Sequence, residues 1–339
     1  MHAYFSLIML DALISLPIFS FFLLPLWTSW TTQLNLAFFY MTWATFVMSH
    51  PAYNVEVVGT LFIRLIFYVI PALAFLAFDC LVPSISTSIK AHGDDALPRR
   101  LGRKKVAKVV GVSLANVLLG VAAQAGIELL ATRVLHVRSV VRINIQLPYP
   151  WDMWMDVAKA FVIRNILQYY IHFYVLHRSR TPVAKYHASW HHSLPLPFSI
   201  AATYDHPLPY LIGHWLPTFI PAALFRFHLL TYFLFLGLVS LEDLFTWSGY
   251  TVLPSHILMT GMARRRDAHM LSSGQGNFAP WGVLDWAHGT GLGKDVVDDL
   301  KAEAEKRDVK GKASNGVEKG GVFLDEAGEK MKRRGRAKR

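Results

Sequence analysis

The sequence predicts an all-α integral membrane protein, built as a multi-span helical bundle with a histidine-rich metal-binding cap on its cytosolic side. Three observations support this fold class. The 339 residues are 53% hydrophobic and only 17% charged, which is too apolar for an ordinary soluble protein. Several apolar runs approach the ~20 residues that a helix needs to cross a bilayer. Five histidines gather between residues 169 and 192, at the end of one such run.

The first third of the chain predicts membrane helices. Residues 4–27 are apolar apart from Asp11. Because no basic segment precedes this run and no small-residue cleavage site ends it, we expect an anchor that is retained. Residues 57–82 and 109–130 are long enough to span a bilayer. Residues 34–49 form a shorter apolar run, which could span or re-enter.

A basic loop predicts which side of the membrane each segment faces. Residues 83–105 contain six cations and few acids: Lys90, Arg99, Arg100, Arg103, Lys104 and Lys105. Short basic loops lie in the cytosol, so this loop, the histidines and the C-terminal tail should share that side. Arginines within residues 133–154 oppose the assignment, because that loop should then be lumenal. The net charge of +11 reflects topology, since no aromatic-interleaved basic groove indicates nucleic-acid binding.

The second half predicts further spans and then a tail. Residues 155–176 should cross the membrane and deliver the histidines to the cytosolic face. Residues 210–241 predict a helical hairpin or two kinked spans, broken near Arg226 and His228. Beyond about residue 294 the chain has too little apolar surface to fold alone. We therefore divide the chain into a transmembrane region (1–135), a histidine-bearing domain (136–292) and a tail (293–339).

The histidines have metal-ligand spacing, H-x4-H for His172 and His177 and H-x3-H-H for His187, His191 and His192. His187 and His191 share a helix face, with His192 about 100° further round. His172 and His177 are roughly 140° out of alignment in an α-helix, so they converge only if the helix ends or loosens near His177. Sites made of imidazole alone suit iron, zinc, copper or nickel. A histidine-rich membrane-surface segment without metal is the alternative.

This pattern resembles the membrane-bound fatty acid hydroxylase and sterol desaturase superfamily. Its members carry histidine boxes of the form H-x(3,4)-H, H-x(2,3)-H-H and H-D-x-H-H, and Tyr169, three residues before the first histidine, also matches. The resemblance implies an integral membrane enzyme that binds two irons and uses dioxygen. Residues 136–292 would form its fatty acid hydroxylase-like domain.

Later segments extend the resemblance to about residue 290. The step Asp205-His206-Pro207 matches a family His-Pro step and makes His206 a candidate ligand. The third box is matched by residues 266–270, RDAHM, in which only Asp267 and His269 agree with the family pattern. The segment GNF at 276–278 resembles the family's G-N-Y.

At three positions this chain lacks a histidine of the family pattern, and these positions concern the second iron. Arg266 and Met270 stand at histidine positions of the third box, and Trp247 stands at the histidine of the family's H-S-G-Y segment. Arginine is always cationic and has no lone pair for a metal. The resemblance nevertheless implies two irons, and we expect a nearby histidine such as His256 to compensate.

Acids near the boxes should form the outer shell of the site, because a ligating imidazole donates its other N–H to a carboxylate or carbonyl. We assign this role to Asp205 and Asp267, each beside a candidate ligand, and a structural role to Asp285. Glu242 and Asp243 fall in an apolar run, where exposure to lipid would be costly. They should therefore face the bundle interior or the cytosolic rim.

The expected activity is hydroxylation or desaturation of a lipid-like substrate: a sterol, fatty acyl chain, sphingoid base or terpenoid. By resemblance, electrons should come from cytochrome b5 and its reductase. The basic run at 333–336 resembles an endoplasmic reticulum retrieval signal, with a solvated tail as the alternative. Two other functions stay open, a single-metal lipid isomerase, lyase or hydrolase and a non-catalytic lipid-binding protein.

Overall fold

The computed structural model describes residues 30–254, 258–299 and 301 of the chain. All regular structure within these ranges is helical, and extended backbone pairs only at two isolated bridges. The described chain is thus all-α, as predicted. Its first unit, Met1–Gly293, holds every element discussed below, and Lys294–Arg339 form a second unit. The predicted anchor at 4–27 and nearly all of the predicted tail lie outside the described residues.

Among the described residues, three helices are long and apolar enough to cross a membrane. The first covers Ala52–Leu81 as α4 (Ala52–Arg64), the π-helical turn η2 (Leu65–Val69) and α5 (Ile70–Leu81). The second covers Arg103–Val134 as α7 (Arg103–Leu129) and the π-helical turn η5 (Leu130–Val134), and the third is α12 (Leu229–Thr246). The first two stand where the sequence predicts spans at 57–82 and 109–130.

Two other helices fall short of a membrane span, one because its apolar stretch is short and the other because of its composition. The first, α3 (Trp30–Ser49), contains a shorter apolar stretch. The second, α8 (Pro150–Tyr170), continues as the π-helical turn η6 (Ile171–His177). The predicted span at 155–176 is therefore helical, but α8 does not reach the hydropathy of a span because it carries Asp156, Lys159 and Arg164.

The apolar run at 210–241 forms a helical hairpin, as predicted. Its first arm is built from α10 (Pro207–Tyr210), the π-helical turn η9 (Leu211–Trp215) and α11 (Leu216–Leu224), and its second arm is α12. The break falls at Arg226, which has a left-handed backbone with φ 49°. His228 Nδ1 then accepts a hydrogen bond from the Leu230 N–H at 3.1 Å and caps α12. Only the second arm has the length and hydropathy of a span.

Shorter helices carry five of the predicted site residues, His187, His191, His192, Asp267 and His269. The shorter helices are α6 (Pro83–Ile89), η3 (Gly93–Ala96), η4 (Pro98–Leu101), α9 (Pro182–Trp190), η7 (His191–Ser193), η8 (Ser199–Thr203), α13 (Leu258–Leu271) and α14 (Val283–His288).

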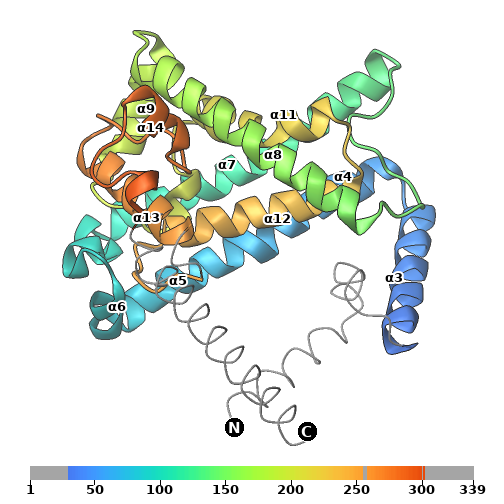
Figure 1. The fold of residues 1–339 in the computed structure, drawn as a ribbon, viewed down its shortest axis with the longest axis horizontal. Helices are drawn as coiled ribbons and strands as arrows, with labels where there is room; N and C mark the ends of the chain where they lie inside the picture. The colour runs from blue at the N-terminus through green and yellow to red at the C-terminus, as the bar shows by residue number, and fades with distance from the viewer. Residues whose placement is uncertain (1–29, 255–257, 300, 302–339) are drawn as a thin grey trace, which may run out of the picture. The chain divides into compact units, whose positions relative to one another are not determined.

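Helix α12 lies at the centre of the first unit. It packs against α4 and η2 on one side and α8 on the other, with α13 near its C-terminal end (Figure 1). Its residues Phe235 and Val239 are fully buried in the main apolar core. The same helix thus links the membrane-type helices to the segments that bear the histidines.

The acids of α12 face the bundle interior, as predicted. Glu242 Oε1 accepts from Arg164 Nη1 of α8 at 2.7 Å. Asp243 Oδ2 lies 3.8 Å from Arg64 Nη1 of α4 and 3.0 Å from His214 Nε2 of η9. Burying these charges is tolerable because each has a partner of opposite charge or a hydrogen bond.

Residues 83–105 contact the histidine-bearing part of the chain. Lys105 Nζ donates to the Ser193 carbonyl at 2.6 Å, and His92 Nε2 lies 3.1 Å from Asp267 Oδ2. Lys90 differs from the other cations of this segment because it is buried, paired with Asp79 at 2.9 Å. The basic surface predicted for 83–105 is therefore made by the remaining five cations.

Candidate metal centre

A π-helical turn aligns the first two histidines. In a π-helix the backbone hydrogen bonds span five residues, so His172 and His177 of η6 stand one above the other. Their ring centroids are 4.8 Å apart and their Nε2 atoms 3.1 Å apart. The helix therefore loosens where the sequence requires it to, and the five-residue spacing is the consequence.

The second group comes from α9 and the turn that follows it. Pro182 begins α9 and the Thr181 hydroxyl caps it. His187 and His191 stack with their centroids 4.6 Å apart, as expected for neighbours on one helix face. The chain then tightens into the 3₁₀ turn η7 and directs His192 to His177, with 3.3 Å between their Nε2 atoms.

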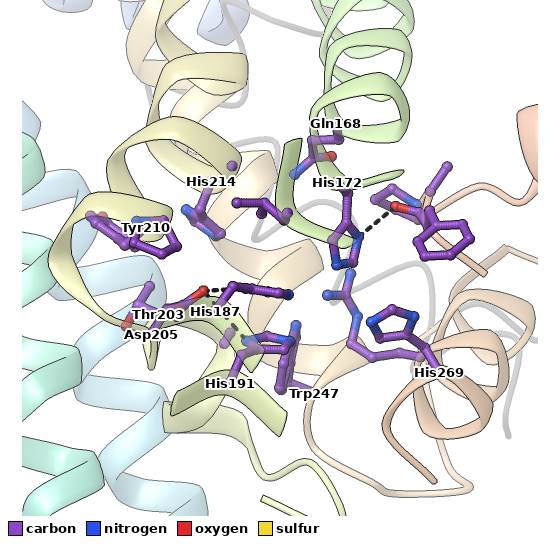
Figure 2. Close-up of a pocket in the computed structure, with 18 of the residues that line it drawn as sticks. Gln168, His172, His187, His191, Thr203, Asp205, Tyr210, His214, Trp247 and His269 are labelled. Carbon is purple, nitrogen blue, oxygen red and sulfur yellow. Dashed lines mark hydrogen bonds and ion pairs between the residues drawn. The ribbon is translucent and has the colours of Figure 1, made fainter. Parts of the chain in front are cut away.

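A sixth imidazole enters from α13. The His269 ring lies 4.7 Å from that of His172, 5.1 Å from His177 and 5.0 Å from His192. Figure 2 shows His172, His187, His191 and His269 directed towards a common space from different segments. The structure thus brings together six of the eight histidines proposed as ligands.

Backbone carbonyls around the cluster fix the tautomer of three imidazoles. Nδ1 of His172 donates to the Phe278 carbonyl at 2.9 Å, Nδ1 of His269 to the Gly276 carbonyl at 2.7 Å, and Nδ1 of His191 to the Tyr204 carbonyl at 3.4 Å. A carbonyl can only accept, so in each neutral ring the proton is on Nδ1 and the lone pair is on Nε2. This tautomer is the one that ligates a metal through Nε2.

The segment at 276–278 therefore supplies two of these acceptors. Asp285 holds the segment, accepting from the Phe278 and Ala279 N–H groups at 2.8 Å each. The structure thus bears out the structural role assigned to Asp285. It also gives the GNF motif a physical purpose, the orientation of His172 and His269.

A buried carboxylate orients His187. Asp205 Oδ2 lies 2.6 Å from His187 Nδ1, on the side of the ring opposite the buried and unpartnered Nε2. Burial raises the pKa of Asp205, and a cation at the cluster would lower it again by attracting the carboxylate through the imidazole. Asp205 thus lies behind His187, where it could orient a ligating imidazole.

Burial also keeps the imidazoles neutral. It lowers the pKa of His187, His191 and His269 well below the ordinary value, and that of His192 to about 4, with neighbouring imidazoles adding to the shift for the first three. The rings are therefore unprotonated at neutral pH without a metal present. His187 Nε2 and His269 Nε2 are buried with no hydrogen-bond partner. Such lone pairs fit a bound cation.

Three predicted site residues are not part of the cluster. His206 stacks on Tyr186 at 4.2 Å, and its Nδ1 accepts from the Leu208 N–H, so it caps α10. Asp267 pairs with His92 instead of supporting His269, because residues two apart on a helix point to different faces. His256 lies outside the described residues.

Of the three residues that depart from the family pattern, two line the cavity and one lies in an apolar core. Trp247 lines the cavity beside the cluster, its ring 5.3 Å from that of His191. The Arg266 guanidinium also lines the cavity and lies over the Trp247 ring at 4.8 Å. Met270 belongs instead to an apolar core. None of the three presents a good metal ligand to the cluster.

The cluster opens onto a cavity of about 80 Å³. Tyr210 and His214 line its end beyond His187 (Figure 2). The apolar run around His214 favours a core or interface role for it, but its position within the π-helical turn η9 places it at the cavity. Its partner Asp243, an acid in an apolar run, is the sequence signal that could have indicated this.

A glycine missed in the sequence packs directly against the cluster. A Cβ at Gly274 would lie 2.1 Å from His177 Cε1 and 3.1 Å from His192 Nε2, and the residue has φ +86°. Only glycine meets both conditions. Its place between the third box and the GNF motif was the available clue.

Comparison with known proteins agrees with this geometry. The fatty acid hydroxylase family matches residues 157–290, which contain all six clustered histidines. Methylsterol monooxygenase 1-2 of Arabidopsis thaliana is 28% identical over 199 residues, covering 53% of this chain and 63% of that protein. Methylsterol monooxygenase 1-1 of the same plant is 28% identical over 176 residues, covering 49% and 58%.

The chain thus spans about three fifths of the length of these curated relatives. No solved structure gives a significant match. The family match falls on the segments that build the histidine cluster. Residues 157–290 thus match the fatty acid hydroxylase family, and the relatives support the resemblance of this chain to the fatty acid hydroxylase and sterol desaturase superfamily.

Proposed function

We propose that the cluster binds iron and that the protein oxidises a C–H bond of a membrane lipid with dioxygen. The observation that carries the proposal is the convergence of neutral imidazoles in one cluster. Backbone carbonyls accept the Nδ1 protons of His172 and His269, which leaves the lone pair of each Nε2 free to bind a metal. An oxidoreductase of the lipid hydroxylase type is also what the family and the relatives support.

In this proposal the chain's own residues bind, orient and shield. The six clustered histidines would hold iron, and iron bound there would supply the dioxygen chemistry. Asp205 and the carbonyls of residues 276 and 278 keep the imidazoles in register. Leu176 and Met262 help to line the cavity and limit access of water.

The cavity supports a substrate whose reacting end is small and whose remainder extends outside the cavity. A volume of about 80 Å³ is far less than the ~300 Å³ or more of a site that encloses a whole drug-sized ligand. A lipid entering from the bilayer would place only the carbon to be oxidised, and its neighbours, in this cavity. Sterols form the leading class because both relatives are named as methylsterol monooxygenases.

Electrons must reach the site from outside the described chain. Hydroxylation of R–H consumes one dioxygen, two electrons and two protons, and yields R–OH and water. We propose cytochrome b5 and its NAD(P)H-dependent reductase as the donor, with the cluster facing the cytosol of the endoplasmic reticulum. The basic segment that contacts the cluster region, through Lys105 and His92, offers an acidic carrier a cationic surface.

The test is oxygen incorporation into lipid. Full-length protein in detergent, loaded anaerobically with ferrous iron, is mixed with cytochrome b5, its reductase, NADH and ¹⁸O₂. A methylsterol and a fatty acyl substrate are supplied in separate reactions, and products are read by mass spectrometry. We expect one labelled oxygen in a lipid alcohol and none with His177→Ala.

A desaturated lipid without label would assign desaturation instead of hydroxylation. Rearranged or cleaved lipid without oxygen consumption would favour the isomerase or lyase alternative. Bound lipid with no chemical change, in protein that retains iron, would favour the non-catalytic alternative.

A further inference from the structure

The spacing of three imidazole nitrogens matches the coordination sphere of one ion. His177 Nε2 lies 3.1 Å from His172 Nε2 and 3.3 Å from His192 Nε2. Two nitrogens bound to one ion at about 2.1 Å, with bond angles between about 90° and 110°, are about 3.0 to 3.4 Å apart. His177 is thus the centre of a ligand set that already has the spacing of a mononuclear site.

The other close nitrogens join the same set. His187 groups with His172 and His177, and His269 groups with His177 and His192, each group lying within 4.8 Å. Both groups contain His177, whose Nε2 has one lone pair and can ligate one ion. Because the two groups share His177, we take them as a single site with five imidazoles around it.

A third possible group does not make a second site. It consists of His187, His191 and Asp205. Asp205 Oδ2 approaches His187 at Nδ1, at the hydrogen-bond distance of 2.6 Å, while His187 Nε2 faces the first set. The Asp205 contact is thus an orienting hydrogen bond, and His191 is the one clustered histidine that remains available for a second ion.

The surroundings of His191 disfavour a second cation. The neighbouring Trp247 ring, 5.3 Å away, has no lone pair to donate, and the Arg266 guanidinium lies over that ring at 4.8 Å. Within the described part of the chain no carboxylate forms an ion pair with Arg266, and its Nε is buried without a partner. Its permanent charge is therefore not neutralised by a direct contact and would repel a second dication.

We propose that the cluster holds one metal ion and that the Arg266 and Trp247 pair occupies the side on which a second ion would bind. The inference rests on the proposed function only in taking the cluster as a metal site. It replaces the sequence-based expectation that a nearby histidine restores a second iron.

Metal content tests the proposal without reference to turnover. Full-length protein in detergent is reconstituted anaerobically with ferrous iron alone, freed of loose metal, and assayed for iron per chain by mass spectrometry. We expect about one ion in the wild type, none in His177→Ala and one in His191→Ala. Two ions in the wild type, or an ion retained by His177→Ala, would overturn the single-ion arrangement.

Variants designed to create a second metal site provide the converse test. Arg266→His removes the cation and adds an imidazole, and the pair Arg266→His with Trp247→His adds two. We expect up to two ions in these variants, with Arg264→His, an exposed position on the same helix, unchanged at one. A double variant that folds, by circular dichroism, and still holds one ion would show that Arg266 and Trp247 do not limit the site.

A variant of His256 distinguishes the single-ion proposal from the expectation that His256 restores a second metal site. His256→Ala should leave one ion, whereas a fall from two ions to one would show that His256 rebuilds a second site. Cobalt(II) in place of iron gives an independent readout, because an isolated high-spin ion has an electron paramagnetic resonance signal that a bridged pair loses by coupling. Failure of any metal to bind would overturn both proposals, whereas binding of two ions would overturn this one alone.

Discussion

At the scale of single residues, the site depends on side chains that do not themselves ligate. Gly274 packs against His177 and His192, and Asp205 holds His187 from behind. Each residue helps to hold an imidazole ring in its position. Variants at these positions should therefore change metal affinity more than they change folding.

Gly274→Ala should weaken metal binding at least tenfold. The added Cβ would lie 2.1 Å from His177 Cε1, so the imidazole must move, and φ +86° adds backbone strain of about 1 kcal/mol. Gly289→Ala is the matched control, because φ is +66° there but nothing lies within 4 Å of a Cβ. Titration with zinc measures the affinities, and equal effects in the two variants would contradict the packing argument.

Asp205→Asn should lower metal affinity by about 10- to 100-fold, the usual cost of losing an orienting carboxylate behind a ligating histidine. The amide still accepts from His187 Nδ1 but no longer stabilises the positive charge that a metal places on the ring. Asp267→Asn removes a buried carboxylate that pairs with His92 instead, and metal competition assays should find it close to wild type. A larger loss in Asp267→Asn than in Asp205→Asn would reverse the assignment.

At the scale of elements, two π-helical turns bring the cavity walls together. Leu176 of η6 packs onto Gly213 of η9, so the turn that aligns His172 with His177 also touches the turn that positions His214. Each turn continues directly from or into an α-helix, α8 into η6 and η9 into α11. Such insertions are frequent at functional sites because they redirect side chains without ending the helix.

Gly213→Ala should separate these turns and destabilise the protein by about 1 to 3 kcal/mol, the usual cost of overpacking. The new Cβ would lie 2.7 Å from Leu176 Cδ1. Gly126→Ala, in α7 with nothing within 4 Å, should instead be neutral or stabilising by up to about 1 kcal/mol. Thermal unfolding in detergent compares the two, and a stabilised Gly213→Ala would contradict the close approach.

The link between α8 and α12 is electrostatic as well as apolar. Arg164→Leu leaves Glu242 buried without its 2.7 Å partner, and should cost about 3 to 5 kcal/mol. The double variant Arg164→Leu with Glu242→Gln should recover much of this loss. Lys159→Leu, which breaks a largely exposed pair with Asp156, should change unfolding by less than about 1 kcal/mol. Similar losses in Arg164→Leu and Lys159→Leu would argue against a buried pair.

At the scale of the whole molecule, the helices of the first unit lead us to expect which loops share a side of the membrane. The helix Arg103–Val134 has 32 residues, a length of roughly 48 Å at 1.5 Å per residue, enough to cross a bilayer. Its first end lies near the histidine cluster through Lys105 and Ser193. Residues 136–146, after its second end, should therefore lie on the opposite side.

Glycosylation acceptors test this sidedness in cells. An Asn-X-Thr site at residues 99–101 should stay unmodified in the cytosol, and one within residues 136–146 should be glycosylated in the lumen. The arginines at 133, 138 and 142 oppose this orientation by the positive-inside rule, which makes the outcome informative. Modification at 99–101 with none at 136–146 would invert the assignment and place the cluster in the lumen.

The sequence by itself determined the all-α membrane class, the hairpin break near Arg226 and five of the six clustered histidines. These follow from local properties, namely hydropathy, backbone breakers and the spacing of imidazoles along a helix. His269 also followed, but only through resemblance to a family motif. Local spacing correctly required the helix to loosen near His177, although it could not specify a π-helical turn.

Only the tertiary structure decided how these pieces meet. Asp267 and His206 stand beside candidate ligands in the sequence yet turn to His92 and to the cap of α10, because neighbours in sequence can face different ways. Gly274, the carbonyls of Gly276 and Phe278, and the Arg266 and Trp247 pair belong to the site only through contacts between distant segments. A metal centre is defined by distances between nitrogens, and those distances are set by packing rather than by order along the chain.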